Sequence, residues 1–445
     1  MYSMHIVKLI QRHRYLLLCI AWTPLAWMLA LPPLGLWPFG LLLYVPLLHL
    51  CRKKKNKVYV FVIAGSASGF IGVVAVFSSF LFNPVEQLYA RFLLFLFFLC
   101  FFVFHFLIIY AAARQETMIA RGMTFIIGIL TTEYCFSRTG IALPLFTGLL
   151  IIDTPLAAFL CRAVGYLAPS AVLLLCNFGI AELLFISPKK SIILFGIVST
   201  MAFIHIYPVH QYTMQGYRLG YVQQAVPHPI IQAAAHFTPL YWDIAEQYIR
   251  AIEQFDSRLD AVILPENAFL LRYDQHYDVY EKLKMIASRM QSDIIAPAIL
   301  GSYDEELYNG LLHIGANGKL QNVYRKINLV PAFESSVFKA GLSSTLFKGN
   351  ISIGPMLCYD SVFPRLYVEY RDAGADLVIV AAEAGFIRNK AVPWIHLSYG
   401  KLYAMTYGIP VLHVSQSGPS ALITPDGNMT GIMQIGKAGV VIIEL

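Results

Sequence analysis

The sequence predicts a chain in two parts, an N-terminal bundle of transmembrane helices and a C-terminal α/β domain. Hydrophobic residues make up 58% of the 445 residues and charged residues only 13%, a composition typical of a protein that lies partly in a bilayer. Apolar runs fill the chain up to about residue 207, whereas short β-rich and amphipathic segments alternate after Gly216. We therefore expect a helical bundle over residues 1–210 and a catalytic domain over residues 211–445.

The first part contains seven predicted membrane crossings. Each approaches the roughly 20 residues that a helix needs to cross the hydrocarbon core. No small-residue cleavage site follows the first run, so we do not expect a cleavable signal. The second run is short and the stretch 142–160 is ambiguous, which leaves the number of crossings open. The runs are Tyr15–Leu31, Leu36–Leu50, Val58–Phe82, Phe92–Ala112, Met118–Phe136, Gly165–Phe185 and Ile192–Tyr207.

Basic residues cluster in alternate loops between these runs. Since loops rich in lysine and arginine stay in the cytoplasm, we expect a cytoplasmic N-terminus and, after seven crossings, a periplasmic second part. The net charge of +7 is spread over such clusters and forms no single patch, so we expect no nucleic-acid partner. The basic clusters are Lys8, Arg12 and Arg14, then residues 52–57, then Arg114 and Arg121, then Lys189 and Lys190.

The second part alternates predicted strands with predicted helices. Short β-rich runs, expected to form strands, are YVQQAV, AVILPENAF, DIIAPAIL, ISIGPMLCYD, DLVIVAAEA, PVLHVSQSG and SALITPDGN, with a hairpin at GLLHIGANGKL. Helices are expected over residues 241–255, 279–290, 365–373 and 396–407. Apolar strands that alternate with helices predict a layered α/β domain, in which functional residues gather at strand ends.

Three polar residues follow predicted strands. Glu266 follows AVIL in the sequence LPEN, Lys326 lies in YRKINLVPAFE, and Cys358 ends ISIGPMLCYD as the only cysteine after position 176. Singly, each has an ordinary explanation as a helix-start carboxylate, a solvated lysine or a core cysteine. Together they supply a base, a fixed cation for a developing oxyanion and a nucleophilic thiol. No cysteine and histidine spacing typical of a metal site is present.

The order Glu, Lys, Cys within LPEN, RKxxLVPxxE and CYD resembles the nitrilase (carbon–nitrogen hydrolase) superfamily. The membrane bundle, the LGLWP sequence and the Thr132-Glu133 pair are similar to one family within it, the bacterial apolipoprotein N-acyltransferases. The resemblance covers nearly the whole chain and implies an α-β-β-α sandwich. It implies that Glu266 is the general base, Lys326 the oxyanion-stabilising lysine and Cys358 the nucleophile.

The same resemblance implies supporting roles for three more residues. Glu334 matches a second glutamate that orients the site, and Tyr359 and Asp360 match the pair after the cysteine, which is usually Tyr-Glu. The implied reaction moves an acyl chain from a phospholipid, through a cysteine thioester, to the N-terminal amine of a diacylglyceryl-cysteine lipoprotein. It needs no metal or organic cofactor, and it implies a multi-pass protein of the bacterial inner membrane.

The sequence also departs from that family. Residues 382–387 read Ala-Glu-Ala-Gly-Phe-Ile where the family has Asn-Asp-x-Trp-Phe-Gly, residues 403–406 read Tyr-Ala-Met-Thr in place of Arg-Ala-Leu-Glu, and GVVIIEL is too short for the family's last membrane helix. These departures leave open an amidase or acyltransferase with another substrate, such as the conjugal-transfer TraB-like branch, or a non-catalytic membrane scaffold.

Three further residues have weaker interpretations. His396 and His413 are expected to be packing or surface residues, because the implied mechanism already has a base. Glu133 lies within a predicted membrane span, where a carboxylate usually faces a partner or a cavity. A structural ion pair and a place near the lipid path are both open for it.

Overall fold

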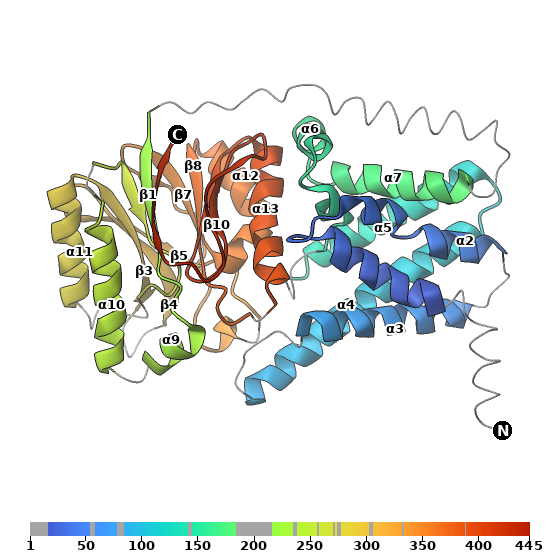
Figure 1. Cartoon of the computed structure of the whole chain (residues 1–445), viewed down its shortest axis with the longest axis horizontal. Helices are drawn as coiled ribbons and strands as arrows, with labels where there is room; N and C mark the ends of the chain where they lie inside the picture. Colours follow the sequence, from blue (N-terminus) through green and yellow to red (C-terminus); the bar gives the residue numbers. More distant parts are fainter. Residues whose placement is uncertain are drawn as a thin grey trace. The chain divides into compact units, whose positions relative to one another are not determined.

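The structure, a computed structural model, describes residues 17–53, 58–77, 84–140, 145–183, 216–234, 238–255, 258–269, 272–273, 277–301, 306–331, 333–387 and 389–445. The chain divides into two compact units, one of Met1–Ser79 with Gln87–Val209 and the other of Phe80–Glu86 with His210–Leu445. We call them the helical unit and the α/β unit (Figure 1).

The helical unit contains helices where most of the apolar runs were predicted. The runs that begin at Val58, Phe92, Met118 and Gly165 correspond to α3, α4, α5 and α7, and the first run contains the apolar helix Leu17–Ala30. Pro46 lies in the first turn of α2, a position where its missing N–H is tolerated. The run Ile192–Tyr207 lies outside the described residues. The elements are η1 (Trp37–Leu42), α2 (Val45–Lys53), α3 (Val58–Phe77), α4 (Pro84–Ala113), α5 (Met118–Ser137), η2 (Thr147–Ile151), α6 (Pro155–Ala163) and α7 (Ala168–Leu183).

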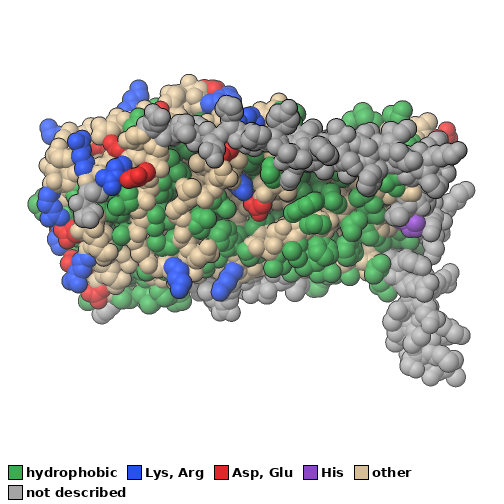
Figure 2. All heavy atoms as spheres, turned by 45° about the horizontal axis from the view of Figure 1, so that its top comes forward, with side chains coloured by type: hydrophobic (Ala, Val, Ile, Leu, Met, Phe, Trp, Pro, Cys, Tyr) green, Lys and Arg blue, Asp and Glu red, His purple; other side chains and the backbone are tan. Residues whose placement is uncertain are grey.

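One helical segment of the described residues, Phe95–Ala113 in α4, is long and apolar enough to cross a membrane by length and composition. The other apolar helices are shorter, so seven crossings remain a prediction. Large hydrophobic side chains are nevertheless exposed on this unit, among them Ile119 at 79% and Val164 at 77%. In the view of Figure 2, hydrophobic side chains cover much of the helical unit, whereas charged side chains are scattered over the α/β unit.

Glu133 joins two elements of the helical unit. Its Oε1 accepts hydrogen bonds from the backbone N–H of Thr147, at 2.9 Å, and from the Thr147 hydroxyl, at 2.6 Å. These bonds tie η2 to α5. Within the described part of the chain Glu133 forms no ion pair, so its observed role is to hold the 147–151 turn in place.

The α/β unit contains two six-stranded sheets with the same pairing pattern. The strand order is β12-β1-β2-β3-β4-β5 in the first and β11-β10-β9-β8-β7-β6 in the second. In each sheet three consecutive strands are parallel and the outer ones antiparallel. The strands are β1 (Arg218–Gln223), β2 (Ala261–Ile263), β3 (Asp293–Leu300), β4 (Tyr308–Ile314), β5 (Leu320–Arg325), β6 (Phe347–Lys348), β7 (Ser352–Leu357), β8 (Leu377–Ala382), β9 (Val411–Ser415), β10 (Ser420–Ile423), β11 (Met429–Met433) and β12 (Gly439–Glu444).

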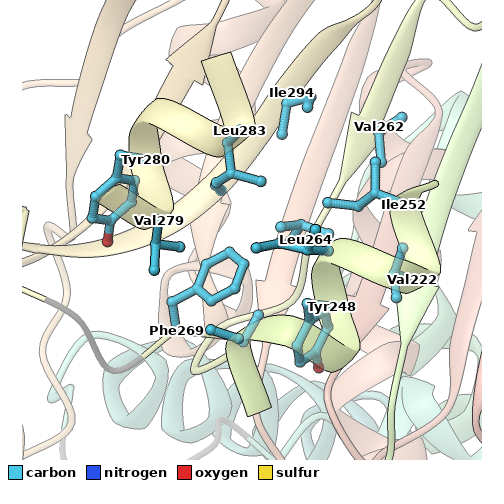
Figure 3. Close-up of a cluster of buried hydrophobic side chains, with 14 of the residues drawn as sticks. Val222, Tyr248, Ile252, Val262, Leu264, Phe269, Val279, Tyr280, Leu283 and Ile294 are labelled. Atoms are coloured by element: carbon cyan, nitrogen blue, oxygen red, sulfur yellow. The ribbon is translucent and has the colours of Figure 1, made fainter. Parts of the chain in front are cut away.

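Helices cover the outer faces of both sheets, so the α/β unit is the predicted α-β-β-α sandwich (Figure 1). Helices α10 (Thr238–Ile252) and α11 (Tyr277–Met290) pack on the first sheet through the cluster in Figure 3, where Tyr248 and Leu283 meet Val262 and Ile294. Helices α12 (Pro364–Asp372) and α13 (Ala391–Tyr407) lie beside the second sheet, and α9 (His228–Ala234) follows β1. The sequence GVVIIEL forms β12, which pairs with β1.

A second buried cluster lies between the two sheets. Side chains of the first sheet, such as Ile263 and Tyr324, meet side chains of the second, such as Leu357 and Ile379. Complete burial of one aliphatic side chain contributes about 1.5–3 kcal/mol, so this layer holds the sheets against each other. It thereby fixes the spacing of the loops that follow β2, β5 and β7.

Candidate active site

The structure brings Glu266, Lys326 and Cys358 together at strand ends. Glu266 lies three residues beyond β2, Lys326 directly follows β5, and Cys358 directly follows β7. All three line one cavity of about 420 Å³. Glu266 and Lys326 therefore follow strands of the first sheet, and Cys358 follows a strand of the second.

Lys326 lies at the centre of a buried charge cluster. Its Nζ is 3.0 Å from Glu266 Oε1 and 2.7 Å from Glu334 Oε1, and the lysine side chain is 1% exposed. Burial alone lowers the pKa of Lys326, but the carboxylates of Glu266 and Glu334 more than offset this, so the pKa lies well above its ordinary value. The lysine is a fixed cation within the cavity.

Asn309 on β4 completes this cluster, and the sequence did not single it out. Its Nδ2 donates hydrogen bonds of 2.9 Å to Oε1 of both Glu266 and Glu334. The backbone N–H of Val330 donates to Glu334 Oε2 at 2.8 Å. Both oxygens of Glu334 are therefore engaged, which suits a residue that orients the lysine rather than one that moves a proton.

Cys358 has an unusual backbone conformation. Its φ is +44°, in the left-handed region that non-glycine residues adopt rarely and at a cost of about 1–3 kcal/mol. It begins the short 3-10 turn η5 (Cys358–Val362). Burial and then the charge of Glu266 raise the pKa of the Cys358 thiol well above its usual value, against the opposing charge of Lys326. The thiol is thus neutral at rest and needs a base to become a nucleophile.

Asp360 ties the Cys358 turn to β5 and to the segment that follows it, where Lys326 lies. Its Oδ2 accepts from the Tyr324 hydroxyl at 2.7 Å and from the Leu357 N–H at 3.2 Å. Its Oδ1 accepts from the Asn328 N–H at 2.7 Å and from Asn328 Nδ2 at 3.0 Å. The shorter aspartate thus has a full set of donors, although the resembled family usually has glutamate here.

Replacing Asp360 with alanine is expected to lower the free energy of unfolding by about 2–3 kcal/mol, because buried donors on Leu357 and Asn328 lose their acceptor. Urea unfolding of the purified full-length chain in detergent measures this. Asp372, an exposed aspartate at the end of α12, is the matched control, and its alanine variant should change stability by less than about 0.5 kcal/mol. Equal effects at the two positions would contradict the assigned role.

The other residues near the cysteine support its turn. Tyr359 packs edge-to-face on Phe363, with ring centroids 5.1 Å apart, and is not among the residues that line the cavity. His396 is buried, and its Nε2 lies 2.8 Å from Ser361 Oγ and 3.0 Å from the Cys358 carbonyl oxygen. His413 packs on His396 with ring centroids 5.0 Å apart. Both histidines are packing residues, as expected, and His396 also holds the cysteine turn.

The rest of the cavity wall is largely apolar. Phe269, Phe333, Phe338 and Phe386 line it with Val330, which gives space for an apolar group beside the thiol. The remaining polar lining includes Glu383 and His228, which the sequence did not single out as site residues. No group of metal-ligating side chains is present among the residues that the structure describes.

Comparison with known proteins identifies the α/β unit. Residues 225–445 match the family model described as carbon-nitrogen hydrolase. The apolipoprotein N-acyltransferase of Shewanella oneidensis is 23% identical over 219 residues, which are 42% of each chain. That of Aquifex aeolicus is 22% identical over 323 residues, 67% of this chain and 70% of the relative. The match to the Shewanella protein thus spans less than half of that relative's length.

Among solved structures, an amidase from Nesterenkonia sp. is 20% identical, with a TM-score of 0.41 over 53% of this chain and 94% of the amidase. A likeness this slight says nothing about substrate. Through residues 225–445 the chain belongs to the carbon–nitrogen hydrolase (nitrilase) superfamily, and it is a divergent relative of the apolipoprotein N-acyltransferases.

Proposed function

We propose that this chain is a membrane acyltransferase that carries an acyl group on Cys358, from a phospholipid to the N-terminal amine of a diacylglyceryl-cysteine lipoprotein. The observation that carries the proposal is the convergence of Cys358, Lys326 and Glu266 in one cavity whose wall includes four phenylalanines and several aliphatic side chains. Relatives named apolipoprotein N-acyltransferase support the reaction class.

In the first half-reaction Glu266 accepts the thiol proton, and Cys358 Sγ attacks the carbonyl carbon of the phospholipid ester. Negative charge develops on the carbonyl oxygen, where the Lys326 ammonium and the backbone N–H after the cysteine stabilise it. The carbon–oxygen ester bond then breaks. The proton passes from Glu266 to the leaving alkoxide, which departs as a lysophospholipid and leaves a thioester.

In the second half-reaction the acceptor amine attacks the thioester carbonyl carbon. A carbon–nitrogen bond forms, the carbon–sulfur bond breaks, and a proton of the amine returns to the sulfur through Glu266. The product is an amide and the thiol is regenerated. Glu334 and Asn309 hold Glu266 and Lys326 at hydrogen-bond distance of each other throughout.

The same proposal includes the membrane. Both substrates keep their acyl chains in a bilayer, and the exposed apolar side chains of the helical unit fit a lipid environment (Figure 2). We place the helical unit in the bacterial inner membrane as a multi-pass anchor. The clustered basic residues support a cytoplasmic N-terminus and, after seven crossings, a periplasmic α/β unit.

Two other functions make different predictions. A relative of the amidase or TraB-like kind would form an acyl-enzyme from another donor, and a scaffold would form none. The buried cluster of Glu266, Lys326 and Glu334 argues against the scaffold. Buried ion pairs contribute little to the stability of a fold, so stability alone does not explain this cluster, whereas a catalytic role does.

Intact-mass spectrometry of the purified chain after incubation with phosphatidylethanolamine tests the acyl-donor step. We expect a mass increase of one acyl chain that hydroxylamine removes. Cys358→Ala should show none, whereas Cys135→Ala, at an exposed cysteine of α5, should behave as the parent chain. An unchanged mass with every phospholipid tried would overturn the acyl-donor proposal and favour the amidase-like or scaffold function.

A further inference from the structure

Glu383 is a buried carboxylate in the active-site cavity that the mechanism above leaves unused. It directly follows β8 and is 3% exposed. Its backbone oxygen lies 3.9 Å from Cys358 Sγ, so this residue adjoins the proposed nucleophile. Its side chain lines the cavity.

One oxygen of this carboxylate has no hydrogen-bond partner among the residues that the structure describes. Oε1 accepts a hydrogen bond from the Gly385 backbone N–H, while Oε2 is buried without a partner in the described part of the chain. Burying a carboxylate oxygen in this way is unfavourable unless a ligand supplies the missing donor. Lys326 is not available for this purpose, because Glu266 and Glu334 already bind it.

His228 presents a second unused acceptor at the same cavity. It begins α9, lines the cavity, and its Nδ1 is buried without a partner among the described residues. Its ring packs against Phe386, with centroids 5.8 Å apart. Burial lowers the pKa of His228, which favours the neutral ring and leaves a nitrogen able to accept a hydrogen bond.

Gly385 leaves the space that the carboxylate occupies. A Cβ at this position would lie 3.0 Å from Ser417 Oγ and 3.3 Å from the His228 Cβ, and it would press most closely on Glu383 Oε1. Any larger side chain at 385 would therefore displace Glu383 or His228. The glycine and the glutamate form one local arrangement.

The charges on the cavity wall indicate which ligand fits. Glu266 and Glu334 face a single described cation, Lys326, and Glu383 adds a third carboxyl whose ionised form would need a further cation beside it. Added positive charge is therefore favoured, and a primary ammonium brings both a charge and three N–H donors. Water and alcohols bring no charge and fewer donors.

We propose that Glu383, together with His228, binds the primary ammonium group of a substrate beside Cys358. This inference rests on the proposed function and adds to it a site for amine recognition. The ammonium could be the α-amine of the acceptor or the ethanolamine head group of a donor lipid.

For the acceptor, the subsite also supplies a proton path. One proton passes from the ammonium to Glu383 Oε2, and the freed lone pair forms the carbon–nitrogen bond with the thioester carbonyl. The carbon–sulfur bond breaks, the second proton goes through Glu266 to the sulfur, and Glu383 then releases its proton to solvent. Burial raises the pKa of Glu383 to about 8; the Gly385 N–H opposes this rise and the Glu266 charge adds to it. This pKa is close to the ~7.7–8.0 of an α-amine.

The test measures binding without acyl chemistry. Full-length Cys358→Ala protein in detergent is titrated calorimetrically with an S-alkylated cysteine dipeptide, either with its free amine or N-acetylated. We expect the free amine to bind at least about 10-fold more tightly, from a charge-assisted hydrogen bond, and Glu383→Gln in the same background to abolish the preference. Equal binding of the two dipeptides to Cys358→Ala excludes the acceptor amine, whatever the outcome of thioester formation. If Glu383→Gln also leaves the ratio of lipid acylation rates described below unchanged, the inference is overturned.

Two additions make the result decisive. Gly385→Ala displaces the carboxylate without removing it and should also abolish the preference, so it substitutes for Glu383→Gln should that variant not fold.

In chains that retain Cys358, the ratio of acylation rates from phosphatidylethanolamine and phosphatidylglycerol identifies the source of the ammonium. A ratio that falls toward one in Glu383→Gln assigns the subsite to the donor head group, and an unchanged ratio with lost dipeptide preference assigns it to the acceptor. Retained dipeptide preference in both variants contradicts the subsite.

Discussion

Replacing Lys326 with methionine is expected to lower the free energy of unfolding by about 3–5 kcal/mol, because Glu266 and Glu334 then share a buried site with no cation. Acylation of Cys358 should also slow by about 10²–10³-fold, since the developing oxyanion loses its charged donor. Urea unfolding measures the first effect and single-turnover mass spectrometry the second.

A compensated variant separates these two effects. In Lys326→Met with Glu266→Gln and Glu334→Gln, neither of the two carboxylates that Lys326 paired remains charged, so most of the stability should return while activity does not. Lys319, exposed in the β4–β5 turn, is the control, and Lys319→Met should change neither quantity. If the compensated variant stayed as unstable as the single one, charge pairing would not be what Lys326 contributes to stability.

Glu266→Gln is expected to slow acyl-enzyme formation by about 10²–10⁴-fold, the usual contribution of a general base. The resting thiol is neutral because burial and the Glu266 charge raise its pKa, so without the base the rate depends on the small thiolate fraction. We therefore expect the rate of the variant to rise with pH, by about tenfold per unit while the thiolate remains a minor species. Single-turnover acylation across pH 6–9 measures this.

The matched control is Glu334→Gln, which alters the other carboxylate bound to Lys326. It should slow acylation less than Glu266→Gln and leave the pH dependence of the parent chain. A steep pH dependence in both variants, or in neither, would argue against Glu266 as the base. Glu246→Gln, on the exposed face of α10, controls for the loss of a negative charge elsewhere.

The residues with local sequence signals were predictable. Glu266, Lys326 and Cys358 each follow a strand within a short motif, and strand ends of an α/β domain converge. The structure places them in one cavity, and Glu334 and Asp360 also lie where the motifs indicated, bound to Lys326 and to the cysteine turn. The strand and helix alternation likewise predicted the sandwich.

Asn309, His396 and Glu383 had no comparable signal. Asn309 and His396 act through hydrogen bonds to residues 25 to 43 positions away, and such pairings follow from strand register rather than from any local pattern. Glu383 stands in a segment noted only for its departure from the resembled family. Its importance comes from burial and a missing partner, which only coordinates reveal. The membrane crossings stay a prediction, because only one described helical segment, Phe95–Ala113, is long and apolar enough.

The site residues come from two different sheets, so the thickness of the buried layer between the sheets determines the distance between Cys358 and Glu266. Ile263 and Tyr324 stand just before the first-sheet loops, and Leu357 just before the cysteine, so their side chains set how far the thiol lies from its base. Packed interiors resist compression and transmit small displacements. A tighter or looser fit between the sheets would thus tune proton transfer at a site that none of these side chains touches.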